Sequence, residues 1–461
     1  LPRIIQQVVE PGFHREDNGS SDIINGRYIT LLISTFIGLY VYLWARNLYG
    51  RSADLFSLFL FVFCPNIAAH ASLVTTDAYS VLCTIASLYH YWKYSREGSR
   101  GQLIFFSIAL AIAQLSKQSL TFLYPLFVLL FLIQLVISRE AINVKSLITN
   151  FIIIIFVQIM VLNIGFQFKQ TGKPLREYAF KSKFFNSVTN RSSFLKDIPL
   201  PLPSPYLYGL DYTKNIDEMG TGHRESSPKA YILGQAKEGK GFWYYYFISL
   251  LFKTPVPLLI SFILSLFLAF KKEMNSGYLD TLVLLFPVLF FLIYFDFFYN
   301  SQVGLRHIIM IFPLIQVFCG NLIKGLPDKK WKGFSVLGLT CYSISTFYYF
   351  FPSLLPYTNE LITDKKMAYK IVGSANLDYN QASESLTRYL RQNRNVEYAP
   401  SVPRAGKFII STNDLLELTS QNGYDWLRNN FKPTDHLQFT YLIFDISKQD
   451  LLSRNLVRGE P

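Results

Sequence analysis

The feature that most constrains this chain is a series of apolar runs, many of them long enough to cross about 30 Å of hydrocarbon as a helix. Hydrophobic residues make up 51% of the 461 residues, and only 16% are charged. Apolar runs joined by short polar loops are typical of a polytopic membrane protein. The runs predict about ten transmembrane helices, at 27–48, 53–69, 77–93, 102–116, 119–137, 147–166, 247–270, 278–298, 305–324 and 332–352.

The short loops alternate between basic and non-basic, which predicts the orientation of the chain. Basic residues follow every second run, as the positive-inside rule expects of cytoplasmic loops. They are Arg46, Arg51, Lys93, Arg96, Arg100, Arg139, Lys145, Lys271, Lys272, Lys324, Lys329, Lys330 and Lys332. The remaining connections and the C-terminus are therefore predicted to lie outside a cytoplasmic (inner) membrane. This scattering among loops also explains the net charge of +13, so no nucleic-acid partner is predicted.

Composition divides the chain into two predicted regions. Residues 1–352 form a transmembrane domain, which includes an external loop at 168–241 that is rich in Pro, Gly and Tyr. This loop is expected to pack over the outer helix ends. Residues 353–461 are more polar and show a helical pattern at 377–390 and strand patterns at 407–411 and 439–445. The predicted fold is mainly α, with a small external α/β domain at the C-terminus.

One short stretch, His70-Ala-Ser-Leu-Val-Thr-Thr-Asp77, places an imidazole and a carboxylate between two apolar runs at the outer face. Charged groups at the end of a spanning helix are costly unless they lie in water or bind something. A structural alternative is that Asp77, together with Thr75 and Thr76, caps the free N–H groups of the helix that it opens. The outer face also collects Lys117, Lys253, Asp296, Arg306 and His307. Each could be an interfacial anchor, but their gathering on one face favours a shared external site.

Motifs along nearly the whole chain resemble the bacterial branch of the protein O-mannosyltransferase-like glycosyltransferases, which are membrane enzymes of the GT-C class. The matching pieces are Tyr42-Leu-Trp-Ala-Arg46 with Tyr49-Gly-Arg51, Pro65-Asn-Ile-Ala-Ala-His70 with Leu73-Val-Thr-Thr-Asp77, Lys117, Gly241-Phe-Trp-Tyr-Tyr245 with Lys253-Thr-Pro255, Gly304-Leu-Arg-His307 with Pro313, Ser374-Ala-Asn-Leu-Asp-Tyr-Asn-Gln381 and Tyr424-Asp-Trp-Leu-Arg428. Their order and spacing carry the resemblance, since no single motif is specific.

The resemblance implies a GT-C-like helix arrangement and transfer of a sugar, of a mannose-like kind, from a polyprenyl-phosphate donor. The acceptor would be a protein, lipid or glycan outside the membrane. Such transfer needs a base for the acceptor hydroxyl and stabilisation of the phosphate leaving group. In the family the base belongs to an acidic motif, usually Asp-Glu, in the first external loop. This sequence begins inside that loop, so the chain as given is expected to be N-terminally truncated and can be inactive on its own.

The polar residues of the outer face then receive predicted roles. Asp77 is the predicted catalytic acid, holding either the acceptor or a divalent metal cation. The donor phosphate is assigned to Lys117, Arg306, Lys253 and His307, because arginine in particular binds phosphate oxygens bidentately. His70 is the predicted second metal ligand, and a purely structural role is the alternative for each histidine. We expect the Asp77 and Arg306 side chains to converge on one water-accessible site.

Two other functions stay open at this stage. A transporter or flippase of lipid-linked sugars would predict discontinuous helices at mid-membrane and inverted repeats. A non-catalytic membrane scaffold would not need Asp77, Lys117 and Arg306 on one side. Neither the sugar nor the acceptor can be named from these residues.

Overall fold

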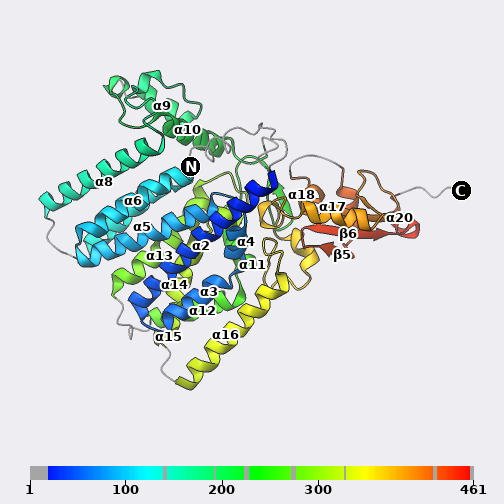
Figure 1. Ribbon diagram of the computed structural model, residues 1–461. Coiled ribbons are helices and arrows are strands. Elements are labelled where there is room, and N and C mark those ends of the chain that lie inside the picture. The colour runs from blue at the N-terminus through cyan, green and yellow to red at the C-terminus, as the bar shows by residue number, and fades with distance from the viewer. Residues whose placement is uncertain are drawn as a thin grey trace.

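A helical bundle forms the larger part of the protein, and a C-terminal domain lies beyond one end of it (Figure 1). The computed structural model describes residues 19–138, 143–191, 194–222, 228–270, 277–325, 329–418 and 423–456. Residues 1–18, which the sequence predicts to belong to the first external loop, lie outside the described residues. Within them the protein is mainly helical, as predicted, and a small mixed sheet is confined to the C-terminal domain.

The first half of the bundle consists of helices that run back and forth between its two ends. Their bounds are α2 (Gly19–Tyr49), α3 (Ala53–Val62), α4 (Pro65–Ser72), α5 (Asp77–Glu97), α6 (Arg100–Ser116), η1 (Gln118–Phe122), α7 (Leu123–Ser138) and α8 (Val144–Gly165). Helix α2 packs on α3 and α5, and α6 packs on α5 and α8. The second predicted span is bent by 59° between α3 and α4. The bend fits Pro65, which has no N–H to continue the helical ladder.

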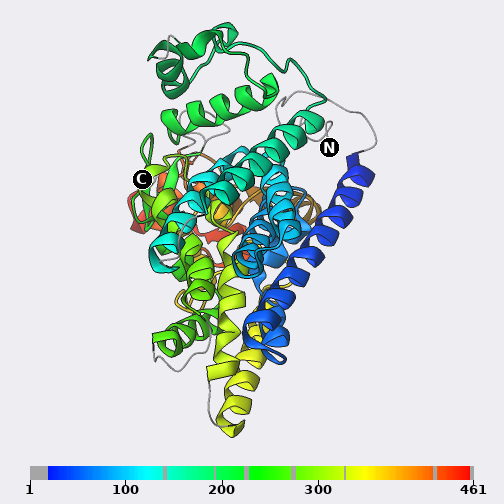
Figure 2. The same cartoon turned by 90° about the vertical axis from the view of Figure 1, so that its left-hand side faces the viewer.

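The external loop of the sequence analysis folds into short elements that pack beside the ends of α6 and α8. These are η2 (Leu175–Glu177), α9 (Lys183–Arg191), η3 (Phe194–Asp197), α10 (Ser204–Met219) and the hairpin β1 (Ala230–Ile232) with β2 (Gln235–Lys237). In Figure 2 the green helices of this segment lie at the top, past the end of α8. The Tyr206 hydroxyl on α10 donates to Gln114 Oε1 on α6 over 3.3 Å, which fixes the loop to the bundle.

The second half of the bundle is more broken than the sequence predicts. It comprises α11 (Tyr245–Lys253), α12 (Val256–Phe270), α13 (Tyr278–Ile293), the π-helical turn η4 (Tyr294–Phe298), η5 (Leu305–His307), α14 (Ile311–Cys319), α15 (Asn321–Gly325) and α16 (Lys329–Phe350). The predicted single helix at 247–270 is wrong, because α11 and α12 meet at 110°. Thr254 between them is extended (ψ 130°), as the residue before a proline prefers to be.

By length and composition, four helical segments of the described chain can cross a membrane, and the number is six if each bent pair is one span. The four are Ile23–Tyr49, Gln118–Ile137, Val144–Gly165 and Leu279–Phe298. The chain is therefore a multi-pass membrane protein. The other predicted spans coincide with shorter or less apolar helices, such as α6 and α14, so the count of ten stays a prediction.

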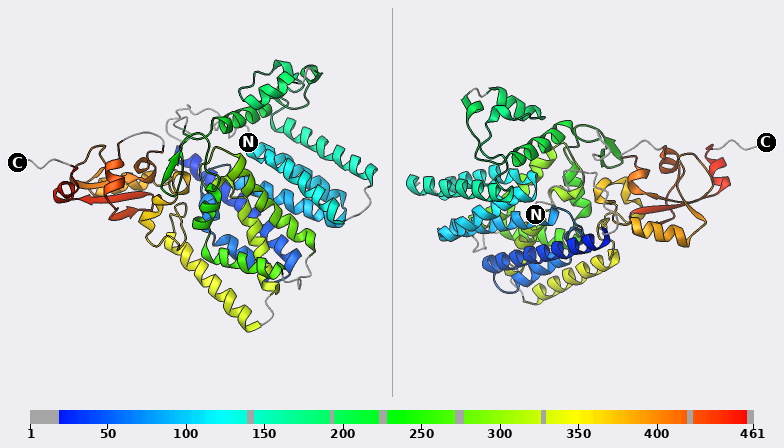
Figure 3. Two further views of the ribbon diagram at one scale, coloured as in Figure 1. Left: turned by 180° about the vertical axis from the view of Figure 1, so that it is seen from behind. Right: turned by 45° about the horizontal axis from the view of Figure 1, so that its top comes forward.

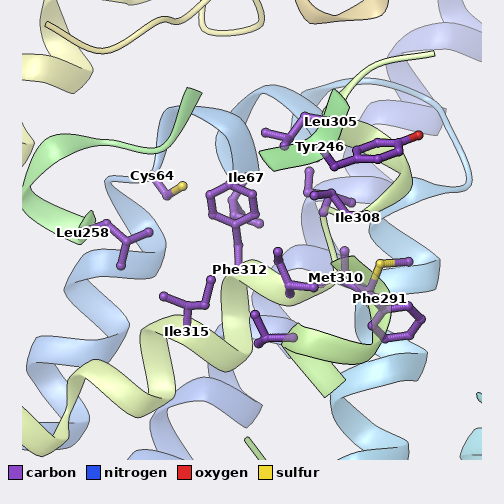
Figure 4. Packing of buried hydrophobic residues seen from close by; sticks show 14 of the residues in the cluster. Cys64, Ile67, Tyr246, Leu258, Phe291, Leu305, Ile308, Met310, Phe312 and Ile315 are labelled. Atoms are coloured by element: carbon purple, nitrogen blue, oxygen red, sulfur yellow. The ribbon is translucent and has the colours of Figure 1, made fainter. Parts of the chain in front are cut away.

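The core of the bundle surrounds α14, whose side chains from Ile311 to Cys319 are all buried. Figure 4 shows Phe312 and Ile315 in one packed cluster with Ile67 of α4, Leu258 of α12 and Phe291 of α13. A nine-residue helix can be apolar on nearly every face because neighbouring helices cover it, and its one polar side chain, Gln316, donates to the Leu60 carbonyl over 3.3 Å. This packing holds the preceding turn, η5, against the ends of the surrounding helices.

The C-terminal domain begins after α16 and contains a four-stranded sheet in the order β3-β4-β6-β5. Its elements are η6 (Lys365–Lys370), η7 (Ser374–Asn376), α17 (Ser383–Gln392), β3 (Val396–Tyr398), β4 (Gly406–Ser411), α18 (Thr412–Leu415), α19 (Asp425–Asn430), β5 (Asp435–Leu437), β6 (Tyr441–Ile446) and α20 (Lys448–Ser453). Strand β3 is parallel to β4, and the other pairs are antiparallel. Both views in Figure 3 place this domain beyond the end of the helices.

The predicted helix at 377–390 begins later than expected, at Ser383. Asp378 Oδ1 accepts a hydrogen bond from the Asn380 N–H over 2.9 Å, and Asn380 has a φ of 60°. This local turn competes with the helix for the backbone N–H groups. The segment before α17 therefore stays free to contact the bundle.

Candidate functional site

The Asp77 carboxylate is fully buried at the start of α5, with 0% of its side chain exposed. The Thr75 hydroxyl donates to Asp77 Oδ2 over 3.1 Å, from the loop between α4 and α5. Within the described chain, the bonds of the carboxylate go to side chains, and the N-cap residue Thr76 makes no side-chain capping bond. The Thr75 hydroxyl also accepts the Asp77 N–H over 3.4 Å, so capping at this helix start comes from Thr75 and leaves the Asp77 carboxylate to its side-chain partners.

Lys117 approaches Asp77 from the break between α6 and η1. An extended backbone at Lys117 (φ −160°, ψ 125°) turns its side chain inward, and Nζ donates to Asp77 Oδ1 over 2.9 Å. Burial lowers the pKa of the Lys117 ammonium from its ordinary value, and the nearby Asp77 charge opposes that shift. The Lys117 side chain is 16% exposed.

Arg306 reaches the same carboxylate from η5. Its Nε lies 3.1 Å from Asp77 Oδ2, and a terminal nitrogen lies 3.4 Å from Oδ1. The Nε contact is an ion pair whose angle does not qualify as a hydrogen bond. The backbone of the turn is fixed by two bonds, from the Gly304 N–H to the Tyr245 hydroxyl and from the Leu305 N–H to Asn376 Oδ1.

The C-terminal domain adds an aromatic side chain to this site. The Arg306 guanidinium lies over the ring of Tyr379, 4.8 Å from its centroid, and also donates to the Tyr379 hydroxyl. A cation over an aromatic face is stabilised by the ring quadrupole. Tyr379 thus gives the guanidinium a second partner besides Asp77.

The cluster carries more positive than negative charge. One carboxylate, Asp77, faces two cations, Lys117 and Arg306, each with a side chain that is 16% exposed. An ammonium has three N–H donors and a guanidinium has five, so both keep donors that Asp77 does not use. A site with surplus positive charge and spare donors can bind an anion, and phosphate oxygens suit it best.

The two histidines flank the cluster in different ways. His70 Nδ1 lies 3.4 Å from Asp77 Oδ2, in line with the predicted neighbourhood. His307 instead pairs its Nδ1 with the Tyr246 hydroxyl over 3.3 Å, and its ring packs on Tyr299. The assignment of His307 to the donor phosphate therefore stays a prediction.

Lys253 is buried and already bonded to backbone. Its ammonium donates to the carbonyls of Leu355 over 2.8 Å and Asn376 over 2.6 Å. These bonds tie the break between α11 and α12 to the chain that follows α16. The predicted phosphate role of Lys253 has no support in these contacts, which are those of a structural cation.

The residues present do not fit the predicted divalent metal. Asp77 and His70 are two candidate ligands, but Asp77 already balances two cations at about 3 Å. A third positive centre there would be repelled. Among the described residues no group of three or more His, Cys, Asp or Glu side chains is placed to hold a metal ion.

Sequence reasoning missed the parts of the site that come from the C-terminal domain. Tyr379 contacts Arg306, and Asn376 bonds both the Leu305 N–H and the Tyr245 hydroxyl, the latter over 3.2 Å. Both residues lie in the motif Ser374–Gln381 that the resemblance singled out. That motif could have indicated that Asn376 and Tyr379 belong to the site, although nothing in the sequence linked it to residue 306.

Three solved structures show a distant likeness to this chain. ArnT from Cupriavidus metallidurans in the apo state is 12% identical, with a TM-score of 0.43, over 72% of this chain and 55% of that one. The same protein bound to undecaprenyl phosphate is 10% identical, with a TM-score of 0.44, over 91% and 83%. An oligosaccharyltransferase from Archaeoglobus fulgidus is 11% identical, with a TM-score of 0.47, over 80% and 47%.

The chain thus spans about half the length of the first of these proteins. No curated protein matches it significantly. Residues 19–164 match a protein family described as dolichyl-phosphate-mannose-protein mannosyltransferase. This match includes two of the three central residues of the ion cluster, Asp77 and Lys117, and it confirms the resemblance drawn from the motifs. Over residues 19–164 the chain is therefore similar to the dolichyl-phosphate-mannose-protein mannosyltransferase family.

Proposed function

We propose that this protein belongs to a membrane glycosyltransferase that moves a sugar, of a mannose-like kind, from a polyprenyl-phosphate donor to a protein, lipid or glycan acceptor. The observation that carries the proposal is the buried Asp77 carboxylate with Lys117 and Arg306 around it. The family match over residues 19–164 supports the same chemistry. The donor phosphate binds the N–H groups of the two cations that Asp77 leaves free.

In the reaction the bond between the anomeric carbon and the phosphate oxygen breaks, and a bond from the acceptor oxygen to the same carbon forms. The bonding electrons leave on the phosphate, where Lys117 and Arg306 stabilise the negative charge. The proton of the acceptor hydroxyl passes to a base. The resemblance assigns that base to the acidic motif of the first external loop, which precedes the described residues.

Asp77 acts in this proposal by holding the two cations in place. A carboxylate with no exposed surface and two cationic partners is poorly placed to take a proton from an acceptor. Without it, Lys117 and Arg306 would repel each other and separate. Asp77 is thus a positioning residue for the phosphate site, whereas the sequence suggested a carboxylate that holds the acceptor or a divalent cation.

The proposed orientation puts the ion cluster on the external face of the cytoplasmic membrane. We place the transmembrane domain at residues 1–352, with about ten helical crossings, and the external domain at 353–461. The alternation of basic loops supports this arrangement. The contact of Tyr379 with Arg306 also requires the C-terminal domain and the cluster to share one side of the membrane.

A transporter of lipid-linked sugars is the alternative, and discontinuous helices would favour it. Two helix pairs are indeed broken, α3 with α4 and α11 with α12. The two breaks lie next to each other, since the Asn66 side chain on α4 donates to the carbonyl of Lys253 at the end of α11. Lys253 in turn bonds Leu355 and Asn376, so the breaks lie at the end of the bundle that meets the C-terminal domain rather than at its middle. This position favours the transferase.

The test compares wild-type and Arg306→Ala forms of the full-length protein in lipid nanodiscs. Affinity for polyprenyl phosphate and sugar transfer from the glycosylated donor are both measured. We expect Arg306→Ala to weaken binding by roughly 10- to 100-fold, since a charge-assisted phosphate contact is worth about 1.5–3 kcal/mol. The matched control is Arg404→Ala, an exposed arginine of the C-terminal domain that pairs with Glu397.

The control variant should bind and transfer like wild type. Equal binding of polyprenol without a phosphate, or unchanged affinity in Arg306→Ala, would overturn the phosphate site. Binding without transfer of any sugar in the full-length wild type would instead favour the transporter.

A further inference from the structure

A polar cavity of about 500 Å³ lies in the C-terminal domain, apart from the ion cluster. Its walls come from η6, α19, β6 and the end of α20, and include Lys370, Arg428, Asn430, Lys432, Asp445 and Arg454. Figure 1 shows α20 on the side of the domain that faces away from the helical bundle. The walls of the cavity thus belong to the C-terminal domain and not to the helical bundle.

Some charges of this cavity are already engaged in the fold. Asp450 caps α20 by accepting hydrogen bonds from the Ser447 hydroxyl and N–H. Arg428 pairs with Asp425 and donates to the Leu415 carbonyl. These groups shape the cavity, but most of their bonding capacity toward a ligand is already used.

Two lysines are not engaged. Lys370 and Lys432 are exposed, and neither makes an ion pair or side-chain hydrogen bond within the described part of the chain. Arg454 lies over the Phe431 ring, 4.6 Å from its centroid, and donates to the Asn430 carbonyl, but forms no ion pair with a described carboxylate. The cavity thus holds two lysines without a carboxylate partner in the described chain, and a third cation, Arg454, whose charge acts on the Asp450 carboxylate without a direct ion pair.

The acidic wall does not cancel this charge. Asp445 lies opposite Lys407 across the β4–β6 pair. The positive charge of Lys407, on the neighbouring strand, therefore partly offsets the negative charge of Asp445. The surplus inside the cavity is positive. Its volume suits a small ligand, since binding sites for such molecules are commonly 300–1,000 Å³.

We propose that this cavity is a binding site for a sugar that carries an anionic group, either a phosphate or a carboxylate. Lys370, Lys432 and Arg454 hold the anion, because ammonium and guanidinium groups make strong charge-assisted hydrogen bonds to such oxygens. The amide side chain of Asn429 and the backbone around it suit the sugar hydroxyls. An apolar ligand is not expected, since Phe431 is the sole apolar residue among the described residues that line the cavity. The proposal stands independently of the phosphate site at Asp77.

The experiment titrates the full-length protein in nanodiscs by calorimetry with four probes: glucose 6-phosphate, glucuronate, inorganic phosphate and glucose. The double variant Lys370→Gln with Lys432→Gln removes the two free charges. Its matched control is Arg388→Gln with Arg391→Gln on α17, which removes two exposed charges of the same domain outside the cavity. Melting temperatures of both variants establish that they fold.

We expect one or both anionic sugars to bind wild type, glucose to bind at least about tenfold more weakly, and the lysine variant to lose about tenfold in affinity. The control should change less than about twofold. Preference for glucose 6-phosphate or for glucuronate then identifies the anion. Equal loss in both variants would mean unspecific charge attraction, and tight binding of inorganic phosphate alone would mean that no sugar is recognised. Either result, or no binding by wild type, would overturn the proposal.

Discussion

Asp77 and Arg306 are separated by 229 positions in the sequence, yet Arg306 Nε lies 3.1 Å from Asp77 Oδ2. One residue opens α5, and the other lies in the turn before α14. Lys117 completes the contact from a third break in the helices. Three chain segments that would otherwise repel or drift apart are thereby joined at one carboxylate.

Removal of the Asp77 charge should separate these segments. Asp77→Asn keeps the side-chain shape but leaves two buried cations without a counter-charge, a change that costs about 3–5 kcal/mol in buried pairs. We expect a lower melting temperature and loss of most sugar transfer in the full-length protein. Asp77→Glu should restore part of both. Wild-type behaviour of Asp77→Asn in both assays would exclude the positioning role.

Lys253 should matter for stability more than for donor use. Lys253→Met leaves the carbonyls of Leu355 and Asn376 without their donor, at about 1–3 kcal/mol for each unsatisfied group. We expect a fall in melting temperature with little change in the KM for the donor. Lys117→Met should show the converse, a raised KM. If Lys253→Met raises the KM as strongly as Lys117→Met, the sequence-based phosphate role of Lys253 is correct.

Gly304 should tolerate no side chain. Its φ is 97°, and a Cβ there would lie 3.2 Å from backbone atoms of Ala375 and Asn376. Gly304→Ala should therefore shift the turn that carries Arg306, with a cost of about 1–3 kcal/mol and a large loss of transfer. Gly338→Ala is the matched control, because a Cβ at this position on α16 meets nothing within 4 Å. A neutral Gly304→Ala would show that the turn can move freely.

Acid should loosen the C-terminal domain through His436. Burial lowers the pKa of His436 below its ordinary value of 6.5, and its Nδ1 accepts the Phe439 N–H over 3.2 Å. The unfolded chain then binds the proton more readily, so stability is present above pH 6.5 and falls as the pH drops toward the folded pKa. Melting temperatures from pH 8 to 5 should show this loss. The slope should flatten in His436→Gln, and an identical slope in both proteins would exclude His436.

The proposed orientation can be tested by cysteine labelling in intact cells. We expect Ser383→Cys, in the C-terminal domain, to react with an impermeant reagent, and Ser99→Cys, before α6, to stay unlabelled. Cys341 is exposed and should first be replaced. Reaction at position 99 alone would reverse the topology.

The convergence of Asp77, Lys117 and Arg306 could be predicted because successive helix ends alternate between the two faces of the membrane. Short loops and apolar runs force every second helix end onto one face, which is information that the sequence contains. The bend at Thr254 was not predicted, although Pro255 and Pro257 lie beside it, because prolines also occur inside transmembrane helices. The partners of Lys253 and the stacking of Tyr379 depend on how the C-terminal domain docks, and no local pattern encodes that.

The contacts of Asn376 have a practical consequence for the design of chimeric proteins. Its side chain holds the turn before Arg306, and its carbonyl holds Lys253, although the residue belongs by composition to the polar C-terminal region. A chimera joined at Pro352 would exchange Asn376 and Tyr379 together with the sheet, and would leave the graft without the contacts that position the arginine. A junction placed after Gln381 keeps the contacts of Asn376 and Tyr379 with the helices. The boundary at which the two parts can be exchanged therefore lies inside the C-terminal domain and not at its start.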